Sequence, residues 1–262
     1  MTKISMVIGA KELKEFVNSL SMLEDFNFDV RNDGIYVHAM DNNSISMVKT
    51  GLPKKVFSKW KVAKGHITVQ GDSIREALKN IKDKDKISIN TSSGANPKLI
   101  LTIGKEKREI PYNEVPSKAE NKEPNVEFTA RITVPAKELK EAINKAKKIN
   151  KYALFIIGEK KLILFAKGET HLRMELPIEG EVKKTTTMQL NMDYLAKMLK
   201  AAGKETPIKL EMKTDEPMRV SYNTGNTDAK YWLAPYINDD NSELIKEALH
   251  PAREKKRERL RA

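Results

Sequence analysis

Residues Ala10–Glu15 read AKELKE, and the same six letters return at Ala136–Glu141. A short helix pattern rich in Lys and Glu can recur by chance, but further matches follow each copy. Three segments recur at a constant spacing of 121 residues, namely Ile74-Leu78-Lys79 with Leu195-Leu199-Lys200, Ile87–Ile89 with Ile208–Leu210, and Leu99–Leu101 with Val220–Tyr222. The sequence therefore predicts a unit of about 120 residues that is built twice.

The composition is that of a soluble protein with room for two domains. The chain has 262 residues, of which 39% are hydrophobic and 32% are charged. No apolar run approaches the roughly 20 residues of a membrane span. The N-terminus, MTKISMVIGAKELK, lacks the apolar core of a signal peptide. We expect a cytoplasmic protein, or a nuclear one if the host is eukaryotic, with no membrane partner.

Charge and cysteine content narrow the class of partner. The absence of cysteine excludes disulfides and thiolate chemistry and fits a reducing compartment. The formal net charge is +12 and the pI is about 9.5. This basic excess favours a polyanionic partner, most often nucleic acid, over the alternative of a merely solvated basic surface.

Apolar residues recur at helical spacing in four segments. Helices are predicted over residues 10–23, 72–82, 136–148 and 192–204, with Asp72 as the N-cap of the second. Each predicted helix carries lysine or arginine on the face opposite its apolar stripe, with acidic residues interspersed. Short alternating segments between them predict strands, including a hairpin around Asn32-Asp33-Gly34.

The segment Asn113–Glu127 loses this periodicity and reads as a linker. The predicted organisation is a domain over residues 1–112, a connector over residues 113–127, a second domain over residues 128–238 and a basic extension over residues 239–262. The fold class is α+β, with two helices packed on antiparallel strands in each domain.

Two stretches carry a resemblance to a known family. Residues 9–48, GAKELKEFVNSLSMLEDFNFDVRNDGIYVHAMDNNSISMV, and residues 217–237, PMRVSYNTGNTDAKYWLAPYI, resemble the opening and closing segments of proliferating cell nuclear antigen, the DNA sliding clamp of archaea and eukaryotes. The resemblance covers residues 1 to about 238. It implies the DNA-clamp fold and a processivity factor that encircles duplex DNA and tethers replication and repair enzymes.

The resemblance also implies a ring of three subunits, with six domains around a hole lined by twelve helices. It assigns the subunit contacts to the strand Lys98–Ile103 of one chain and to Thr170–Leu176 of the next. The interface candidates are Leu99, Leu101, Leu172 and Met174. Pairing in a closed ring would also cover strand edges that are otherwise exposed.

Helical position and the resemblance together select the residues that would face DNA. They are Lys11, Lys14, Arg75, Lys79, Lys140, Lys147, Lys197 and Lys200. Duplex DNA carries about one negative charge per 1.7 Å of its axis, so lysines can attract it without reading bases. Flexible, hydrated ammonium groups would permit sliding.

A second predicted site binds partner proteins. In the family, a hydrophobic pocket accepts short peptides of partners, which here would include DNA polymerase, clamp loader, ligase and nuclease. The matching positions are Met40, Ser44, Met47, Val115, Pro217, Trp232, Ala234 and Pro235. Met40 and Met47 have an alternative interpretation as ordinary core residues. The connector here is more polar than is usual in the family, and the chain is basic where family members are typically acidic.

The chain extends past the usual end of the family in SELIKEALHPAREKKRERLRA, residues 242–262. Its first part predicts a short amphipathic helix with Ser242 as N-cap. Beyond Pro251 it is rich in lysine and arginine, which is typical of a solvated tail and could also indicate contact with DNA or a partner.

No enzymatic chemistry is indicated. The four histidines are scattered singly, there is no phosphate loop, nucleophile elbow or dinucleotide fingerprint, and no metal or cofactor is expected. The alternative function is a duplicated DNA-binding regulator that embraces DNA as an open monomer or dimer.

Overall fold

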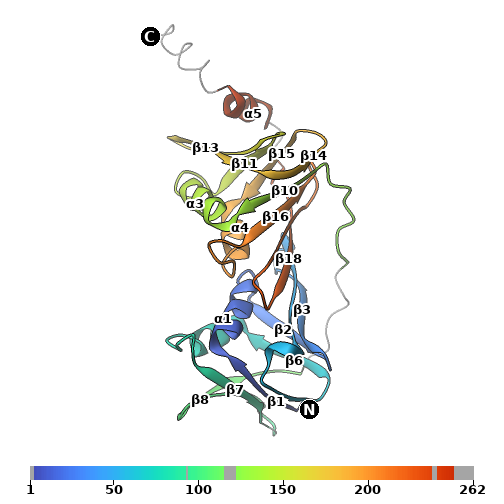
Figure 1. Ribbon diagram of the computed structural model, residues 1–262, viewed down its shortest axis with the longest axis vertical. Helices are drawn as coiled ribbons and strands as arrows, with labels where there is room; N and C mark the ends of the chain where they lie inside the picture. The colour runs from blue at the N-terminus through green and yellow to red at the C-terminus, as the bar shows by residue number, and fades with distance from the viewer. Residues whose placement is uncertain (1–2, 93, 115–121, 238–240, 251–262) are drawn as a thin grey trace. The chain divides into compact units, whose positions relative to one another are not determined.

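The computed structural model describes residues 3–92, 94–114, 122–237 and 241–250 (Figure 1). Its backbone contacts separate into two compact units, each assembled from segments that lie apart in the sequence. Unit 1 comprises Met1–Glu123, Lys197–Gly203 and Ser221–Trp232, and unit 2 comprises Pro124–Ala196, Lys204–Val220 and Leu233–Ala262.

The same order of elements occurs twice: one strand, a helix, five strands, a helix and three strands. Repeat 1 consists of β1 (Ile4–Gly9), α1 (Ala10–Ser19), β2 (Asp25–Val30), β3 (Gly34–Met40), β4 (Ser46–Pro53), β5 (Lys59–Val62), β6 (Gly65–Gln70), α2 (Gly71–Ala77), β7 (Lys86–Thr91), β8 (Lys98–Ile103) and β9 (Glu106–Pro111), with the 3-10 helix η1 (Lys54–Val56) after β4. Repeat 2 consists of β10 (Ala130–Pro135), α3 (Ala136–Ala146), β11 (Tyr152–Ile157), β12 (Lys161–Lys167), β13 (His171–Pro177), β14 (Glu179–Val182), β15 (Thr186–Asn191), α4 (Met192–Met198), β16 (Pro207–Met212), β17 (Met218–Asn223) and β18 (Asp228–Leu233). The doubling that the sequence predicts is confirmed.

The two repeats also start their first helix in the same way. A strand runs directly into α1 and into α3, and neither helix has a side-chain cap. The N–H of Ala10 instead donates to the carbonyl of Asp85, and the N–H of Ala136 donates to that of Thr206, at 2.8 and 2.9 Å. The two acceptors are 121 residues apart, so the sequence spacing corresponds to structural equivalence.

In unit 1, one sheet has the order β5-β1-β7-β8-β9 and the other contains β18-β4-β3-β2-β6. Helix α1 lies against β1 and β4, and α2 lies against β6 and β9. The buried stripe of α1 contains Leu13, Phe16 and Val17, because apolar residues spaced by three and four share one helical face. Phe16 packs on Phe28, which in turn packs on Phe26, in the core.

In unit 2, one sheet contains the order β14-β10-β16-β17 and the other has the order β13-β12-β11-β15. Helix α3 lies against β10, β12 and β13. Strands β11 and β12 are nearly continuous apolar runs, YALFII and KLILFAK, because both of their faces are buried. A fifth helix, α5 (Asn241–Leu249), lies on the face of this sheet opposite α3 (Figure 1).

Several expectations about element ends were wrong. The first four helices all end earlier than their periodicity predicts, in turns at residues such as Leu20 and Leu78. Asp72 is not an N-cap, because α2 begins at Gly71 and the Asp72 carboxylate pairs with Arg75 instead. Ser242 lies within α5, which begins at Asn241.

A buried pair of tyrosines ties strands of repeat 2 to helix ends within unit 1. The Tyr231 hydroxyl donates to the carbonyl of Ser19 at the end of α1, at 3.0 Å, and the Tyr222 hydroxyl donates to that of Met198, at 2.7 Å. The two hydroxyls lie 3.0 Å apart. Burial raises the pKa of both groups, so they stay protonated as donors at neutral pH.

We expect Tyr231→Phe to lower the free energy of unfolding by about 1–3 kcal/mol, because it leaves the buried Ser19 carbonyl without this donor. Urea denaturation measures the change. Tyr236→Phe is the matched control, since the Tyr236 side chain is 42% exposed. Equal effects of the two substitutions would contradict a specific role for the buried hydroxyl.

Candidate nucleic-acid interface

The basic residues predicted on α1 differ in how available they are. Lys11 is exposed, whereas Lys14 is held by the carbonyl of Ile81 and by the carboxylate of Asp83, 2.8 Å from its Nζ. The hydrogen bond from Lys14 lowers the pKa of Asp83, so this carboxylate stays charged. Lys11 therefore offers a positive charge to solvent, while that of Lys14 is largely matched.

Arg75 on α2 is part of the fold rather than a free surface cation. Its guanidinium donates to Asp72 at 2.7 Å and to the carbonyl of Leu23 at 2.8 Å, and it lies 5.0 Å from the centre of the Phe26 ring. The interpretation of Arg75 as a residue available to DNA is not supported by these contacts. Lys79, just past the end of α2, is exposed and lies 3.4 Å from Glu76.

Helix α4 and the turn after it supply two exposed lysines, Lys197 and Lys200. The neighbouring Leu195, Met198 and Leu199 are buried. This alternation is the one that the helical period predicts. Together with Lys11 and Lys79, Lys197 and Lys200 are the exposed residues among the DNA-facing candidates of unit 1.

In unit 2, the basic face of α3 borders a hollow of about 360 Å³. It is lined by Lys137, Lys140, Glu141, Asn144, Lys145, Lys148 and Lys204. Burial lowers the pKa of Lys140, and Lys145 pairs with Glu141 at 2.7 Å. Lys147 is exposed and pairs with Asp193 on α4, also at 2.7 Å.

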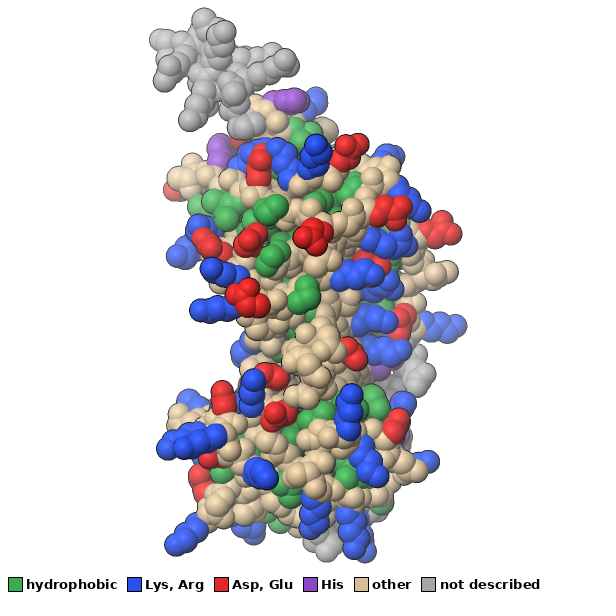
Figure 2. All heavy atoms as spheres, in the orientation of Figure 1, with side chains coloured by type: hydrophobic (Ala, Val, Ile, Leu, Met, Phe, Trp, Pro, Cys, Tyr) green, Lys and Arg blue, Asp and Glu red, His purple; other side chains and the backbone are tan. Residues whose placement is uncertain are grey.

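Sequence reasoning selected Lys140 and Lys147 but passed over Lys137, Lys148 and Lys204. Their signal was present, since Lys137 and Lys148 fall close together beside Lys140 on the helical wheel, and Lys204 follows Lys197 and Lys200 at helical spacing. Figure 2 shows the mixed character of one face of the protein, where basic side chains are interspersed with acidic ones. Such a surface attracts a polyanion through many weak contacts rather than a few strong ones.

The strand edges correct one of the predicted subunit contacts. Strand β8 (Lys98–Ile103) is paired on both sides, with β7 and with β9. Leu99 and Leu101 are 4% and 0% exposed and belong to the core. The interpretation of Lys98–Ile103 as an edge strand was therefore wrong: the edge strand next to β8 is β9, and β5 is at the other edge of the sheet.

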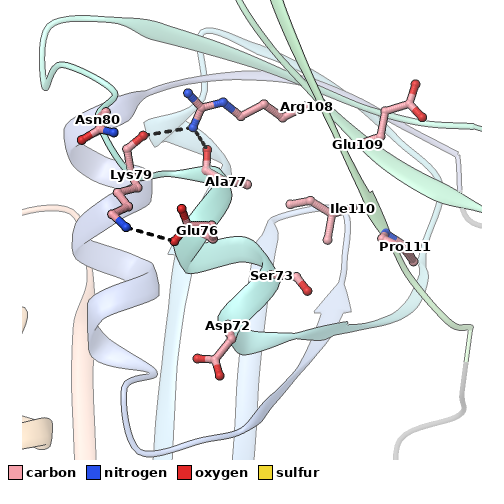
Figure 3. A pocket seen from close by; sticks show the side chains of 10 residues that line it. All are labelled: Asp72, Ser73, Glu76, Ala77, Lys79, Asn80, Arg108, Glu109, Ile110 and Pro111. Carbon is pink, nitrogen blue, oxygen red and sulfur yellow. Dashed lines mark hydrogen bonds and ion pairs between the residues drawn. The ribbon is translucent and has the colours of Figure 1, made fainter.

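Beside β9, the surface is hollowed over about 630 Å³ (Figure 3). The lining residues come from α2, the turn after it and β9: Asp72, Ser73, Glu76, Ala77, Lys79, Asn80, Arg108, Glu109, Ile110 and Pro111. Arg108 donates to the carbonyls of Ala77 and Lys79 at 2.7 and 3.0 Å and so caps the C-terminal end of α2. Hydrogen bonds from Lys107 and Lys98 lower the pKa of Glu109 to about 2, which keeps it charged.

Strand β13 is the edge of its sheet, as predicted. It pairs with β12 in a register that places Leu172 opposite Ala166 and Met174 opposite Leu164. Leu172 and Met174 are half-buried, so part of their apolar surface is exposed beside the unpaired edge.

The predicted peptide pocket is only partly at the surface. Met40 is 39% exposed, but Met47 and Trp232 are 2% exposed and pack as core, so the core alternative holds for Met47 and not for Met40. Ser44 lies in a turn with φ of 57°. Pro217, Ala234 and Pro235 are half-buried, and Val115 lies outside the described residues.

Three exposed apolar residues were missed. Ile45 in unit 1 is 37% exposed, and Tyr236 and Ile237 in unit 2 are 42% and 73% exposed. The ring of Tyr236 stacks on that of Tyr152, with centroids 4.2 Å apart. Ile45 directly follows Ser44 and Tyr236 directly follows Pro235 in the sequence, so their places beside predicted pocket residues could have indicated them.

Within the described part of the chain, no group of three or more His, Asp or Glu side chains is placed to hold a metal ion. No described helix is both long and apolar enough to cross a membrane.

Comparison with known proteins identifies the family. Residues 6–117 match the family model described as proliferating cell nuclear antigen, N-terminal domain. The DNA polymerase sliding clamp of Pyrococcus furiosus is 30% identical over 226 residues, which cover 82% of this chain and 90% of that protein. DNA polymerase sliding clamp 1 of Pyrobaculum aerophilum is 29% identical over 243 residues, covering 88% of this chain and 96% of that protein.

Solved structures agree on the fold. The A. fulgidus PCNA bound to the C-terminal region of FEN-1 superposes with a TM-score of 0.78 at 22% identity, covering 90% of this chain and 100% of that one. The corresponding protein of Entamoeba histolytica gives a TM-score of 0.80 at 18% identity, with the same coverage. The DNA-clamp fold expected from the sequence is confirmed, and the chain belongs to the proliferating cell nuclear antigen family of DNA polymerase sliding clamps.

Proposed function

We propose that this sliding clamp is a closed ring of three identical chains around duplex DNA, joined by pairing of β9 of one chain with β13 of the next. Each chain contributes two clamp domains, residues 1–112 and 128–238, joined by a connector at residues 113–127. The family consists of non-catalytic processivity factors, and the names of the relatives do not favour the alternative of an open DNA-binding regulator.

One observation carries this proposal. Within unit 1, β18 lies beside β4 in a sheet. In the repeat, β18 is the equivalent of β9, and β4 is the equivalent of β13. Because β9 and β13 are equivalent to β18 and β4, they could pair in the same way. Within the ring, that pairing would join β9 of one copy to β13 of another.

Such a contact is head to tail, because the two surfaces that meet are different. Head-to-tail contacts generate a ring when the rotation between copies closes, and a ring leaves no unpaired edge of this kind. The half-buried Leu172 and Met174 on β13, and the hollow between α2 and β9, are suited to an interface that completes its packing on assembly.

For DNA, we propose contacts from the exposed lysines of the four helices, namely Lys11, Lys79, Lys147, Lys197 and Lys200, with Lys140 and its neighbours Lys137, Lys148 and Lys204. Lys14 and Arg75 would contribute mainly to the fold. Many of these cations have carboxylates nearby, which favours weak, exchangeable contacts with phosphates. Enclosure of the duplex would then supply the retention that these contacts do not.

For partners, we propose that peptides of replication and repair enzymes bind at exposed apolar side chains. Met40 and Ile45 are the candidates in unit 1, and Ala234, Pro235, Tyr236 and Ile237 are the candidates in unit 2. The bound C-terminal region of FEN-1 in the A. fulgidus structure supports this class of partner. DNA polymerase, ligase and the clamp loader would use the same kind of contact, because exposed methionine and tyrosine suit adaptable peptide recognition.

The first test is the mass of the assembly. Light scattering should give about 89 kDa, three times the chain mass of 29.8 kDa. Leu172→Asp places a charge in the proposed interface and should shift the mass to that of one chain with its circular dichroism retained. Thr185→Asp, in the exposed loop before β15 at the other edge of this sheet, is the control. A Leu172→Asp protein that keeps a mass near 89 kDa would refute the assignment of this edge.

The second test concerns the DNA-facing lysines. Replacing Lys197 and Lys200 by Gln should weaken binding to duplex DNA several-fold and reduce the slope of log affinity against log salt by about 0.9 for each phosphate that is no longer neutralised. Lys54 and Lys55 on η1 are exposed and serve as a control pair with the same change of charge. Fluorescence anisotropy across a salt series measures both slopes, and an equal weakening in both double variants would indicate an effect of net charge alone.

A further inference from the structure

Helix α5 covers an apolar patch on the outer face of the four-stranded sheet in unit 2. The patch consists of Leu154 and Ile156 on β11 and Ile163 and Phe165 on β12, all at most 4% exposed. Ala248 of α5 is fully buried against them, and Leu244 and Ile245 pack at the margin. The helix that the sequence predicts in the C-terminal extension is thus a packed part of the domain.

Polar contacts of α5 concentrate on β13 and the adjoining end of β12. The Glu247 side chain is only 6% exposed and pairs with Nζ of Lys167 and with Nε2 of His171, the latter at 3.3 Å. Lys167 and His171 are directly opposite each other in the β12–β13 pair. The Nε of Arg173 donates to the carbonyl of Ala248 at 2.7 Å, in the last turn of α5, where helix carbonyls lack helical partners.

These contacts fix the outward side chains along the sheet edge. Residues 171, 173 and 175 of β13 point to the same face, because successive strand residues alternate. His171 is held by Glu247, Arg173 by Ala248, and Glu175 by both Arg173 and Lys161, at 2.5 and 2.7 Å. Each of them would adjoin a strand that paired with β13, because neighbouring strands lie about 4.8 Å apart and their facing side chains touch.

A helix that served only to cover the apolar patch would not need this arrangement. Leu244, Ile245 and Ala248 supply the cover, whereas a nearly buried carboxylate must give up its hydration. The partners of Glu247 are basic side chains beside the edge.

On β9, the strand proposed to arrive there, Arg108 points toward α2, whereas Lys107 and Glu109 share the other face. Glu109 is already paired with both Lys107 and Lys98, at 2.8 and 2.7 Å. Because the carboxylate of Glu109 is already matched by two lysines, Glu247 is the group that supplies a counter-charge to Lys167 beside this edge.

We propose that α5 is an assembly element of the clamp, which prepares the outward face of β13 for a second copy of this chain by holding His171 and Arg173 in place and by balancing the charge of Lys167 through Glu247. This inference rests on the ring proposed above. It assigns the first part of the C-terminal extension to the subunit contact, on the sheet face opposite α3 and its lysines (Figure 1).

The test compares Glu247→Gln, which removes the charge and keeps the shape, with Lys246→Gln on the exposed side of the same helix. Sedimentation equilibrium of the full chain measures the dissociation constant of the assembly. We expect Glu247→Gln to raise it about tenfold, equivalent to about 1.4 kcal/mol, and Lys246→Gln to leave it within about twofold. Hydrogen–deuterium exchange should show faster exchange in His171–Pro177 for Glu247→Gln at the same concentration.

The outcomes separate this inference from the proposed ring. A wild-type chain that stays monomeric at every concentration overturns the ring, and the inference with it. A wild-type ring whose dissociation constant is unchanged by Glu247→Gln overturns the inference alone. The inference alone is also overturned if Glu247→Gln lowers the urea midpoint of the dissociated chain by enough to account for all of the weaker association. If Glu247→Gln does not fold, Leu244→Ser at the half-buried margin of α5 takes its place, with the same expected rise and the same contradicting result.

Discussion

Unpaired strand edges are the constraint on which the rest of this structure depends. An edge exposes N–H and C=O groups that will pair with any suitable strand, so a stable protein has to cover it or use it. Here the duplication supplies two edges of complementary kind, β9 and β13, in the same chain. Because their equivalents β18 and β4 already lie side by side within unit 1, the proposed ring needs no type of strand contact that the chain does not already contain.

The helices illustrate how a basic protein can hold DNA loosely. The count of 48 lysine and arginine residues overstates the positive charge available to DNA, because many of these cations have a carboxylate partner. Lys14 is bound to Asp83, Lys147 to Asp193, and the guanidinium of Arg219 binds the nearly buried Glu211 through two hydrogen bonds. Weak contacts of this kind suit a clamp that must move along DNA, and retention would then come from closure of the proposed ring.

The sequence was sufficient for the repeat and the four repeat helices, because these follow from recurring motifs and apolar periodicity. The clamp fold was expected from the family resemblance of residues 9–48 and 217–237. It was insufficient where a side chain's partner decides its role. Arg75 has the helical position of a DNA contact but is bound to Leu23 and Asp72, and Trp232 matches a pocket position but is core. The sequence did not indicate β9 as the edge strand, because its residues, EKREIP, are charged and give no strand pattern, although charged residues are common on edge strands. The apolar β8 was predicted to be the edge, and only the structure shows that it is paired on both sides.

The central claim is that closure around the duplex, rather than affinity for it, retains this protein on DNA. The most direct measurement loads the clamp onto nicked circular DNA with a clamp loader, isolates the complex at high salt and then cuts the circle once. The account predicts that the protein stays on the circle and leaves after the cut, because it slides off the new ends. Equal retention on the circle and on the cut DNA, or release from both at high salt, would contradict it.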